Sequence, residues 1–414
     1  MSSLHVYVHF PWCLEKCPYC DFVSFKTERA AIDHDGYADA IVREVEARAG
    51  ASGLFSEGDD GRPPVLSSIF LGGGTPSLWS PTSVARVLRA IQAAFGGGER
   101  VEITAECNPS SLDGDRAKAL VDAGVNRLSV GVQSLDGKQL GFLGRLHDVA
   151  MARAAVRGAI ATGARVSADL IFGLPGQPAA EAAAHAGELV DLGLSHLSAY
   201  SLTIEQGTRF GELARRGKLP LAAEDDTCDA FLAIEEALAT RGLRHYEVSN
   251  YARVGEESRH NLGYWLGAAY VGLGCAAYGF GHVRGARPRV GVRYRNDPDP
   301  RRYVEGTHAL SAHVAATSEA EPRVGDGVTT TVEPLDVDTL VRERIMLGLR
   351  LADGLDLDRT ADELAMPREA VWTSARTRTV ERLSHEGALA VSGARLRIPA
   401  HRRLATDGIA ARLF

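Results

Sequence analysis

The chain has 414 residues, a formal net charge of −7 and 24% charged residues. This length exceeds one ordinary core, so we expect two or three domains. The charges form no basic or acidic block, which argues against non-specific nucleic-acid binding. No secretory leader and no bilayer-spanning apolar run is apparent, which predicts a cytoplasmic location.

The first half of the chain alternates strand-like and helix-like segments. β-branched or apolar runs predict six strands, at 5–10, 67–73, 101–107, 126–132, 165–174 and 195–202. Alanine-rich amphipathic stretches predict helices between them, for example at 33–49, 81–95, 113–123, 147–162 and 179–192. This alternation predicts a parallel sheet with right-handed crossovers, open or curled into a barrel, with its site at the C-terminal ends of the strands.

Two segments are poor in large apolar residues and rich in turn residues. We interpret residues 50–64 as a surface insertion and residues 314–332 as a linker. The chain after the linker predicts three short helices and a small β-wing at 389–398. Such winged-helix shapes often bind nucleic acid, but no basic stripe marks a helix that would enter a groove, so we expect no nucleic-acid partner.

Three cysteines, Cys13, Cys17 and Cys20, directly follow the first predicted strand, and the other three cysteines are isolated. In a reducing compartment such spacing indicates metal or redox chemistry, because three thiolates can converge on one soft metal centre. A structural zinc normally takes a fourth Cys or His; His9 could supply it, but His9 lies on the predicted strand, where a histidine is more often simply packed. A 4Fe-4S cluster held by three thiolates instead leaves one iron open. Both alternatives stay open at this point.

The spacing CxxxCxxC after the first strand of a βα-repeat chain, with the aromatic Tyr19 before the third cysteine, resembles the radical S-adenosylmethionine enzymes. The resemblance implies a 4Fe-4S cluster on the three cysteines. It also implies that the amino nitrogen and carboxylate oxygen of S-adenosylmethionine chelate the open iron, and that reductive cleavage gives a 5'-deoxyadenosyl radical.

Further segments carry hydrogen-bonding groups at the ends of the predicted strands. LGGGTPS at 71–77 lacks the Lys-Ser/Thr of a phosphate loop and the glycine spacing of a dinucleotide site. It looks like the segment that contacts the methionine amino group. AECNP, SVGVQS, LGRLHD and DLIFGLPGQ closely resemble the oxygen-independent coproporphyrinogen III oxidase branch. The resemblance implies that the following residues bind S-adenosylmethionine: Tyr7, Gly73, Gly74, Thr75, Glu106, Gln133, Arg145 and Asp169.

Two departures argue against porphyrinogen decarboxylation. Phe22 stands where the dehydrogenases of this branch carry a further cysteine, and only twelve residues precede Cys13, too few for their N-terminal extension. HNLGYW at 260–265 instead resembles the HNxxYW motif of the sister group, the HemW family of heme chaperones. A neutral His260 could ligate heme iron, and Tyr264 and Trp265 offer flat apolar surface. The motif also contains Asn261.

The ligand set for heme stays open. Tyr278 replaces a histidine that many of these relatives carry, and Cys275 is an alternative ligand that nothing else supports.

Together these features predict an α/β protein with three parts. A partial (βα)6 barrel spans residues 1–215, a connecting region with the heme motif spans 216–330, and a helical, winged-helix-like domain spans 331–414. The resemblance implies a heme chaperone that carries a 4Fe-4S cluster with S-adenosylmethionine and hands heme to an acceptor hemoprotein. The alternatives are a coproporphyrinogen III oxidase of porphyrin biosynthesis and a zinc-stabilised binding protein. Cleavage of S-adenosylmethionine, covalent heme attachment, the acceptor, the oligomeric state and peripheral membrane contact stay open.

Overall fold

The computed structural model describes residues 3–49, 64–96, 100–283, 285–317 and 322–414. A twelve-stranded sheet dominates it, in the order β14-β13-β12-β11-β1-β4-β5-β6-β7-β8-β10-β9. The six predicted strands appear in it, within two residues of their expected bounds: β1 (Ser3–Phe10), β4 (Val65–Gly73), β5 (Glu102–Cys107), β6 (Arg127–Gln133), β7 (Arg165–Phe172) and β8 (His196–Ser201). Each runs parallel to its neighbour, which confirms the α/β fold class.

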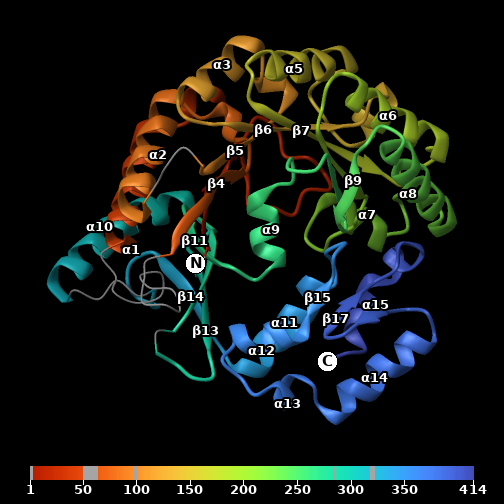
Figure 1. Ribbon diagram of the computed structural model, residues 1–414. Helices are drawn as coiled ribbons and strands as arrows, with labels where there is room; N and C mark the ends of the chain where they lie inside the picture. The colour runs from red at the N-terminus through yellow and green to blue at the C-terminus, as the bar shows by residue number, and fades with distance from the viewer. Residues whose placement is uncertain (1–2, 50–63, 97–99, 284, 318–321) are drawn as a thin grey trace.

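Helices connect these strands and lie along the outer side of the curved sheet (Figure 1). The five predicted helices are α1 (His34–Ala49), α2 (Pro81–Phe95), α3 (Gly114–Asp122), α5 (Val149–Ala161) and α6 (Ala179–Asp191). Side-chain caps define where two of them begin, because Asp113 and Asp148 accept hydrogen bonds from backbone amides of the first turn. Three further helices complete this part: α4 (Gly137–Phe142), α7 (Arg209–Arg215) and α8 (Glu224–Ala239).

The pleat of β1 separates an apolar face from a polar one. Its even-numbered residues, from Leu4 to Phe10, are buried in the main core that the helices cover. Its odd-numbered residues, His5, Tyr7 and His9, point to the inner side of the barrel, because successive side chains of a strand alternate between faces. The barrel interior therefore holds polar groups that need hydrogen-bond partners.

The sheet continues past the predicted barrel at both edges. Strand β11 (Ala269–Leu273) runs parallel to β1, and β12 (Tyr278–His282), β13 (Gly291–Asn296) and β14 (Thr329–Leu335) follow antiparallel. At the other edge lie β10 (Asn250–Ala252) and β9 (Arg244–Glu247). Residues of the expected connecting region thus extend the same sheet. The boundaries at 215 and 330 stay a prediction.

The predicted linker at 314–332 was wrong at both ends. Helix α10 (Pro300–Thr317) occupies its beginning and β14 its end, while residues 318–321 lie outside the described chain. The sequence hid β14 because it is an edge strand whose middle residues are largely exposed and polar. Of the predicted insertion at 50–64, residues 50–63 also lie outside the described chain.

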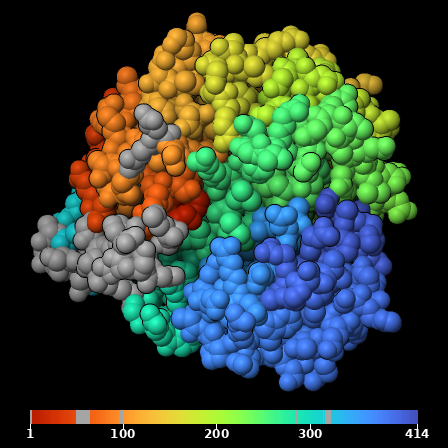
Figure 2. Space-filling model, viewed as in Figure 1, coloured from red at the N-terminus to blue at the C-terminus, as the bar shows by residue number. Residues whose placement is uncertain are grey.

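The last part of the chain forms a lobe with its own apolar core (Figure 2). Its helices are α11 (Val337–Gly348), α12 (Leu357–Glu363), α13 (Arg368–Val371), α14 (Ser374–His385) and α15 (Thr406–Ala411). A small antiparallel sheet of β15 (Leu355–Asp356), β17 (Arg395–Arg397) and β16 (Ala390–Ser392) contains the predicted β-wing. Across the described ranges, no helix combines the length and apolar character that a bilayer crossing needs.

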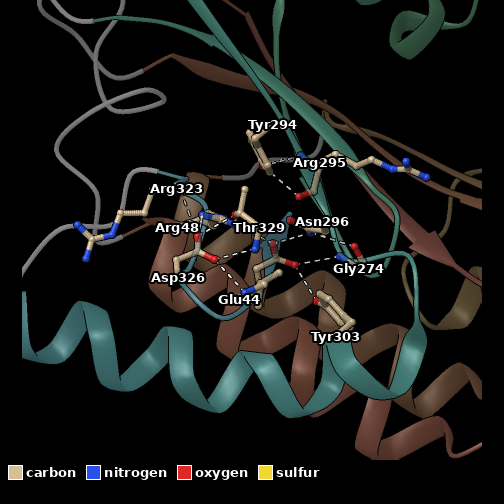
Figure 3. Close-up of polar contacts among 12 residues, drawn as sticks. Glu44, Arg48, Gly274, Tyr294, Arg295, Asn296, Tyr303, Arg323, Asp326 and Thr329 are labelled. Carbon is tan, nitrogen blue, oxygen red and sulfur yellow. Dashed lines mark hydrogen bonds and ion pairs between the residues drawn. The ribbon is translucent and has the colours of Figure 1, made fainter. Parts of the chain in front are cut away.

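A buried charged network ties α1 to the added strands (Figure 3). Glu44 accepts hydrogen bonds from the amide of Gly274 at 2.9 Å, the Asn296 side chain at 2.8 Å and the Tyr303 hydroxyl at 2.7 Å. Burial raises the pKa of Glu44. These donors come from the β11–β12 turn, β13 and α10, so one carboxylate joins three elements.

Arg48 supplies the positive charge of this network. Its guanidinium lies 3.4 Å from Glu44 and 3.3 Å from Asp326, and it donates to the Thr329 hydroxyl at 3.0 Å. The side chains of Arg48 and Glu44 have no exposed surface. Because a buried charge without a partner is costly, each member stabilises the fold only while the others are present.

Replacing Arg48 by Met should lower the free energy of unfolding by about 3–5 kcal/mol, because Glu44 and Asp326 would stay buried without their cation. Urea unfolding followed by circular dichroism measures this. Glu46→Gln, at an exposed position of the same helix, is the control and should change the value by less than about 0.5 kcal/mol. Equal urea midpoints for Arg48→Met and wild type would show that the network is not needed.

Candidate functional site

The three predicted cluster cysteines lie in one loop that leaves the C-terminal end of β1. Short strands β2 (Trp12–Cys13) and β3 (Phe25–Lys26) pair in parallel and close this loop. The amide of Phe25 donates to the Pro11 carbonyl at 2.8 Å, and the amide of Thr27 donates to the Cys13 carbonyl at 2.9 Å. Cys13, Cys17 and Cys20 are half-buried free thiols in this closed loop.

His9 fixes the loop from the barrel interior, a role that its sequence position did not reveal. Its Nε2 lies 2.8 Å from the Val23 carbonyl and its Nδ1 lies 3.0 Å from the Tyr7 hydroxyl. Because a carbonyl can only accept, Nε2 carries the proton and Tyr7 donates to Nδ1. Burial lowers the pKa of His9 to about 4, which keeps this ring neutral. His9 is therefore a brace for the loop, with both ring nitrogens engaged.

The glycine-rich segment lies directly against the start of the cysteine loop. The amide of Gly74 donates to the Phe10 carbonyl at 2.7 Å, and the amide of Thr75 donates to the Trp12 carbonyl at 2.9 Å. A Cβ at Gly74 would lie 2.7 Å from the Trp12 carbonyl oxygen, so only glycine permits this approach. The Thr75 hydroxyl then reaches the Cys13 sulfur at 3.3 Å.

Arg145 brings a positive charge to the same rim. Its guanidinium donates to the Cys17 sulfur at 3.5 Å and to the Gly131 carbonyl at 2.8 Å. A cleft at the rim is lined by Cys17, Thr75 and Arg145, together with Asn108 and Ser110, which the sequence did not single out. The structure thus gathers side chains from three distant segments beside one cysteine.

Glu106, near the end of β5, lies close enough to Asp169, within β7, for the charge of Asp169 to affect its pKa. Burial and the nearby Asp169 raise the pKa of Glu106 from 4.5 to about 7, although Glu106 accepts from the amide of Gly73 at 3.1 Å. Burial likewise raises the pKa of Asp169, to which the Ser129 hydroxyl lies at 3.3 Å. Gln133 ends β6 with a φ of 67°, an uncommon conformation for a non-glycine residue that re-aims its side chain.

The donor set of the loop suits an iron–sulfur cluster. Burial raises the pKa of Cys13, and it raises the pKa of Cys20 to about 11, so both thiols are protonated near pH 7 and a cluster would convert them to thiolates. The Thr75 hydroxyl, beside the Cys13 sulfur, and the Arg145 guanidinium, beside the Cys17 sulfur, would stabilise the negative charge of these thiolates. Within the described ranges, no three His, Cys, Asp or Glu side chains gather closely enough for a single metal ion.

The HNLGYW residues lie at the other end of the barrel. They form α9 (Arg259–Trp265), which sits on the inner side of the sheet and contacts β1 and β4 (Figure 1). His260 Nδ1 lies 2.7 Å from the Ser68 hydroxyl, which lies 2.8 Å from His5 Nδ1. His5 and Ser68 stand in the first halves of their strands, whereas the cysteine loop follows the strand ends.

The serine between the two histidines determines their protonation. One hydroxyl has one proton, so it donates to one Nδ1 and accepts from the other. If His260 Nδ1 donates to Ser68, the Ser68 hydroxyl donates to His5 Nδ1, and the proton of His5 is then on Nε2. Nε2 of His5 donates to the Ser3 hydroxyl at 3.3 Å, so no ring N–H is left unpaired. The reverse arrangement leaves a buried N–H on His260 Nε2, which has no partner among the described residues. The first arrangement is favoured and leaves His260 Nε2 a bare acceptor.

The other motif residues are divided between two environments. The Tyr264 ring packs edge-on against His260, with ring centroids 4.8 Å apart, while Trp265 lies toward the C-terminal lobe. The backbone amide of Asn261 donates to the hydroxyl of Ser258, the N-cap of α9, at 3.4 Å. The structure therefore does not gather the whole motif on one surface. No local sequence pattern indicated Ser68 as the partner of His260.

Cys275, the alternative heme ligand, and Tyr278, which replaces a histidine of the relatives, lie away from α9. Cys275 is fully buried in the main core, where its amide donates to the Tyr37 hydroxyl at 3.0 Å and burial raises the pKa of its thiol to about 12. Tyr278 is an exposed residue of β12.

Glu106→Gln should stabilise the protein without added ligands at alkaline pH. Because the folded pKa of Glu106 is raised from 4.5 to about 7, the wild type loses stability as pH rises across this window. The amide avoids this loss, so the variant should gain about 1–3 kcal/mol at pH 8 and nothing at pH 4.5. Thermal melts at both pH values test this, with Glu46→Gln as control. An unchanged or lower melting temperature at pH 8 would contradict the buried carboxyl.

Comparison with known proteins agrees with this architecture. The family model of the radical SAM superfamily matches residues 7–189, and that of the HemN C-terminal domain matches residues 335–403. Coproporphyrinogen III oxidase (HemN) from Escherichia coli, a radical SAM enzyme, is a structural neighbour with a TM-score of 0.76 and 21% identity, covering 100% of this chain and 90% of that chain. At this identity the likeness concerns the fold alone.

Sequence relatives identify the family. The chain is 37% identical to the heme chaperone HemW of Escherichia coli K12 over 313 residues, which cover 75% of this chain and 78% of that protein. It is 31% identical to the heme chaperone HemW of Mycobacterium tuberculosis H37Rv over 407 residues, which cover 98% and 93%. With identities of this size across most of each protein, the chain belongs to the heme chaperone HemW family of the radical SAM superfamily.

Proposed function

We propose that the protein is a heme chaperone, which binds heme, carries a 4Fe-4S cluster with S-adenosylmethionine, and transfers heme to an acceptor hemoprotein. The observation that carries the proposal is the hydrogen-bonded chain from His260 through Ser68 to His5. It orients a neutral imidazole with its Nε2 unpaired, the form in which histidine ligates iron. Burial, His5 and Arg127 lower the pKa of His260 well below 6.5, so the ring is neutral at pH 7.

Heme ligation requires a movement of α9. His260 is only 1% exposed and stacks on Phe70, with ring centroids 4.9 Å apart. A macrocycle can approach Nε2 only when this seven-residue helix leaves the inner side of the barrel. Loading and release of heme would then be coupled to one short element, which suits a carrier better than a permanent heme protein.

At the other end of the barrel, Cys13, Cys17 and Cys20 would hold the cluster. A bound cluster with S-adenosylmethionine supplies one-electron chemistry when reduced. Arg145 would orient the methionine carboxylate, and the Gly73–Thr75 segment would accept the amino group. Tyr7 would lie near the methionine end, while Glu106, Gln133 and Asp169 would bind the nucleoside. The six free cysteines are consistent with a cytoplasmic location.

The rival function is the decarboxylation of a porphyrinogen propionate to a vinyl group by the same cofactors. Incubating the reconstituted, reduced protein with coproporphyrinogen III and S-adenosylmethionine under anaerobic conditions separates the two. The chaperone proposal expects no protoporphyrinogen above the control without protein. Sustained formation of protoporphyrinogen would contradict it.

Cys17→Ser should abolish the cluster and leave the barrel folded, because the loop lies at the rim and its backbone is held by His9 and β3. Iron and sulfide analysis after anaerobic reconstitution, with far-ultraviolet circular dichroism, measures both effects. Cys228→Ser, on α8, is the matched control and should keep the cluster. Stoichiometric zinc without sulfide in the wild type would instead establish a zinc-stabilised binding protein.

His260→Ala should weaken heme binding at least tenfold, because a ligand bond to iron is lost, while iron and sulfide content stays unchanged. His196→Ala is the matched control. This histidine is also buried in the barrel, 2% exposed; its Nε2 pairs with the Tyr246 hydroxyl at 2.9 Å, while its Nδ1 has no partner among the described residues. Titration of both variants followed by the Soret band decides the question. Equal affinities of wild type and His260→Ala would remove His260 from the heme site.

A further inference from the structure

A pocket lies where the C-terminal end of α9 meets the C-terminal lobe. Trp265 and Leu266 line it from the α9 side, Arg344 comes from α11, Arg359 from α12 and Arg395 from β17. In Figure 2 the blue lobe abuts the green and teal part of the chain that contains α9. The pocket is thus built jointly by the barrel and the lobe, at the end of the barrel remote from the cysteine loop.

The charges around the pocket are unbalanced. Arg359 pairs with Glu363 at 2.8 Å, and Arg395 pairs with Asp356 at 3.8 Å. Arg344 forms no ion pair among the described residues and donates to the Leu266 carbonyl. Burial lowers the pKa of Arg344, the charges of Glu363 and Glu343 oppose this, and Arg289 and Arg359 act in the same direction as burial. Asp356 and Glu363 also line the pocket, each paired with another arginine, so Arg344 is a largely desolvated cation without an ion-pair partner of its own among the described residues.

A second donor in the wall also lacks a partner. The indole Nε1 of Trp265 is inaccessible to solvent and has no acceptor among the described residues. Arg350 covers the ring of Trp265, with its guanidinium carbon 5.7 Å from the ring centroid, and is itself paired with Asp407. Buried N–H groups are nearly always hydrogen-bonded, so an indole N–H without an acceptor, in the same pocket wall as a guanidinium without an ion pair, favours a ligand that accepts hydrogen bonds.

Gly267 accommodates Arg344 at this place. The glycine follows the C-cap of α9 with a φ of +65°, and a Cβ there would clash with the guanidinium. Any other residue would push Arg344 out of the pocket. The position of the cation is therefore set by the turn that follows the motif.

We propose that this pocket binds a carboxylate, with Arg344 as the ion-pair partner and the Trp265 indole as a hydrogen-bond donor. Two sources share this chemistry, a propionate arm of heme and a free small carboxylate. Leu266 is 51% exposed beside the pocket and, with the Trp265 ring, offers apolar surface to a macrocycle. The heme source rests on the proposed function. In that case Arg344 of the lobe binds the propionate, while His260 in the barrel ligates the iron.

The heme source is tested by titrating the protein with heme and with heme dimethyl ester, whose carboxylates are blocked. Wild type should bind heme about tenfold tighter than the ester. Arg344→Gln and Trp265→Phe should reduce this preference toward one, by weakening heme and not the ester. Arg344→Lys should restore part of it. Arg342→Gln, an exposed arginine of the same helix, is the control. Equal affinity for heme and ester in wild type would overturn the heme source.

The pocket itself is tested without heme, by adding acetate to protein labelled with nitrogen-15 on its tryptophans. The Trp265 indole resonance, assigned by its absence in Trp265→Phe, should shift saturably in wild type and in Arg342→Gln but not in Arg344→Gln. Saturable acetate binding without preference for heme over ester would make a free carboxylate the ligand. Acetate that shifts no resonance, with no heme preference, would overturn the carboxylate site. Absence of any heme binding would instead contradict the proposed function.

Discussion

The polar hydrogen bonds on the inner face of β1 position both halves of the candidate site. His9, at the C-terminal end of the strand, fixes the cysteine loop through the Val23 carbonyl, and His5, near its beginning, fixes His260 through Ser68. Both contacts follow from the pleat, which sends these side chains inward while Leu4 and Val6 enter the core. Strand β1 thus sets the distance between the cysteine loop and α9.

The barrel is supported on its open side by strands that the first half of the chain does not contain. Residues after the motif return to β1 as β11 and continue to β14, and the buried carboxylate of Glu44 joins them to α1 through Gly274 and Asn296. The motif helix α9 lies between β10 and β11 in the chain, so it is carried by the segment that closes the sheet. Because β11 pairs with β1, α9 is connected through β11 to the strand that precedes the cysteine loop.

Much of the fold could be predicted from the sequence, because apolar residues recur with the periods of buried strands and amphipathic helices. The six barrel strands and five helices follow from this pattern, the rule that parallel strands gather their C-terminal ends predicted the place of the site, and the family resemblance named Cys17, Thr75 and Arg145 as residues of it. Three features could not be predicted. β14 is a polar edge strand, the loop contact of His9 depends on a carbonyl fourteen residues away, and Ser68 reaches His260 across 192 residues. Each depends on tertiary contacts that no local pattern records.

The motif residues also show how a sequence motif can separate in space. His260 and Tyr264 enter the barrel, while Trp265 faces the C-terminal lobe, so the six residues connect two environments through one turn and a half of helix. The central claim, that this chain carries heme and passes it on, is tested most directly by loading the reconstituted protein with heme and adding an apo-hemoprotein. We expect the heme spectrum of the donor to be replaced by that of the acceptor, faster than heme is released from the donor to a scavenger. Heme that leaves only at the scavenger rate, or not at all, would contradict it.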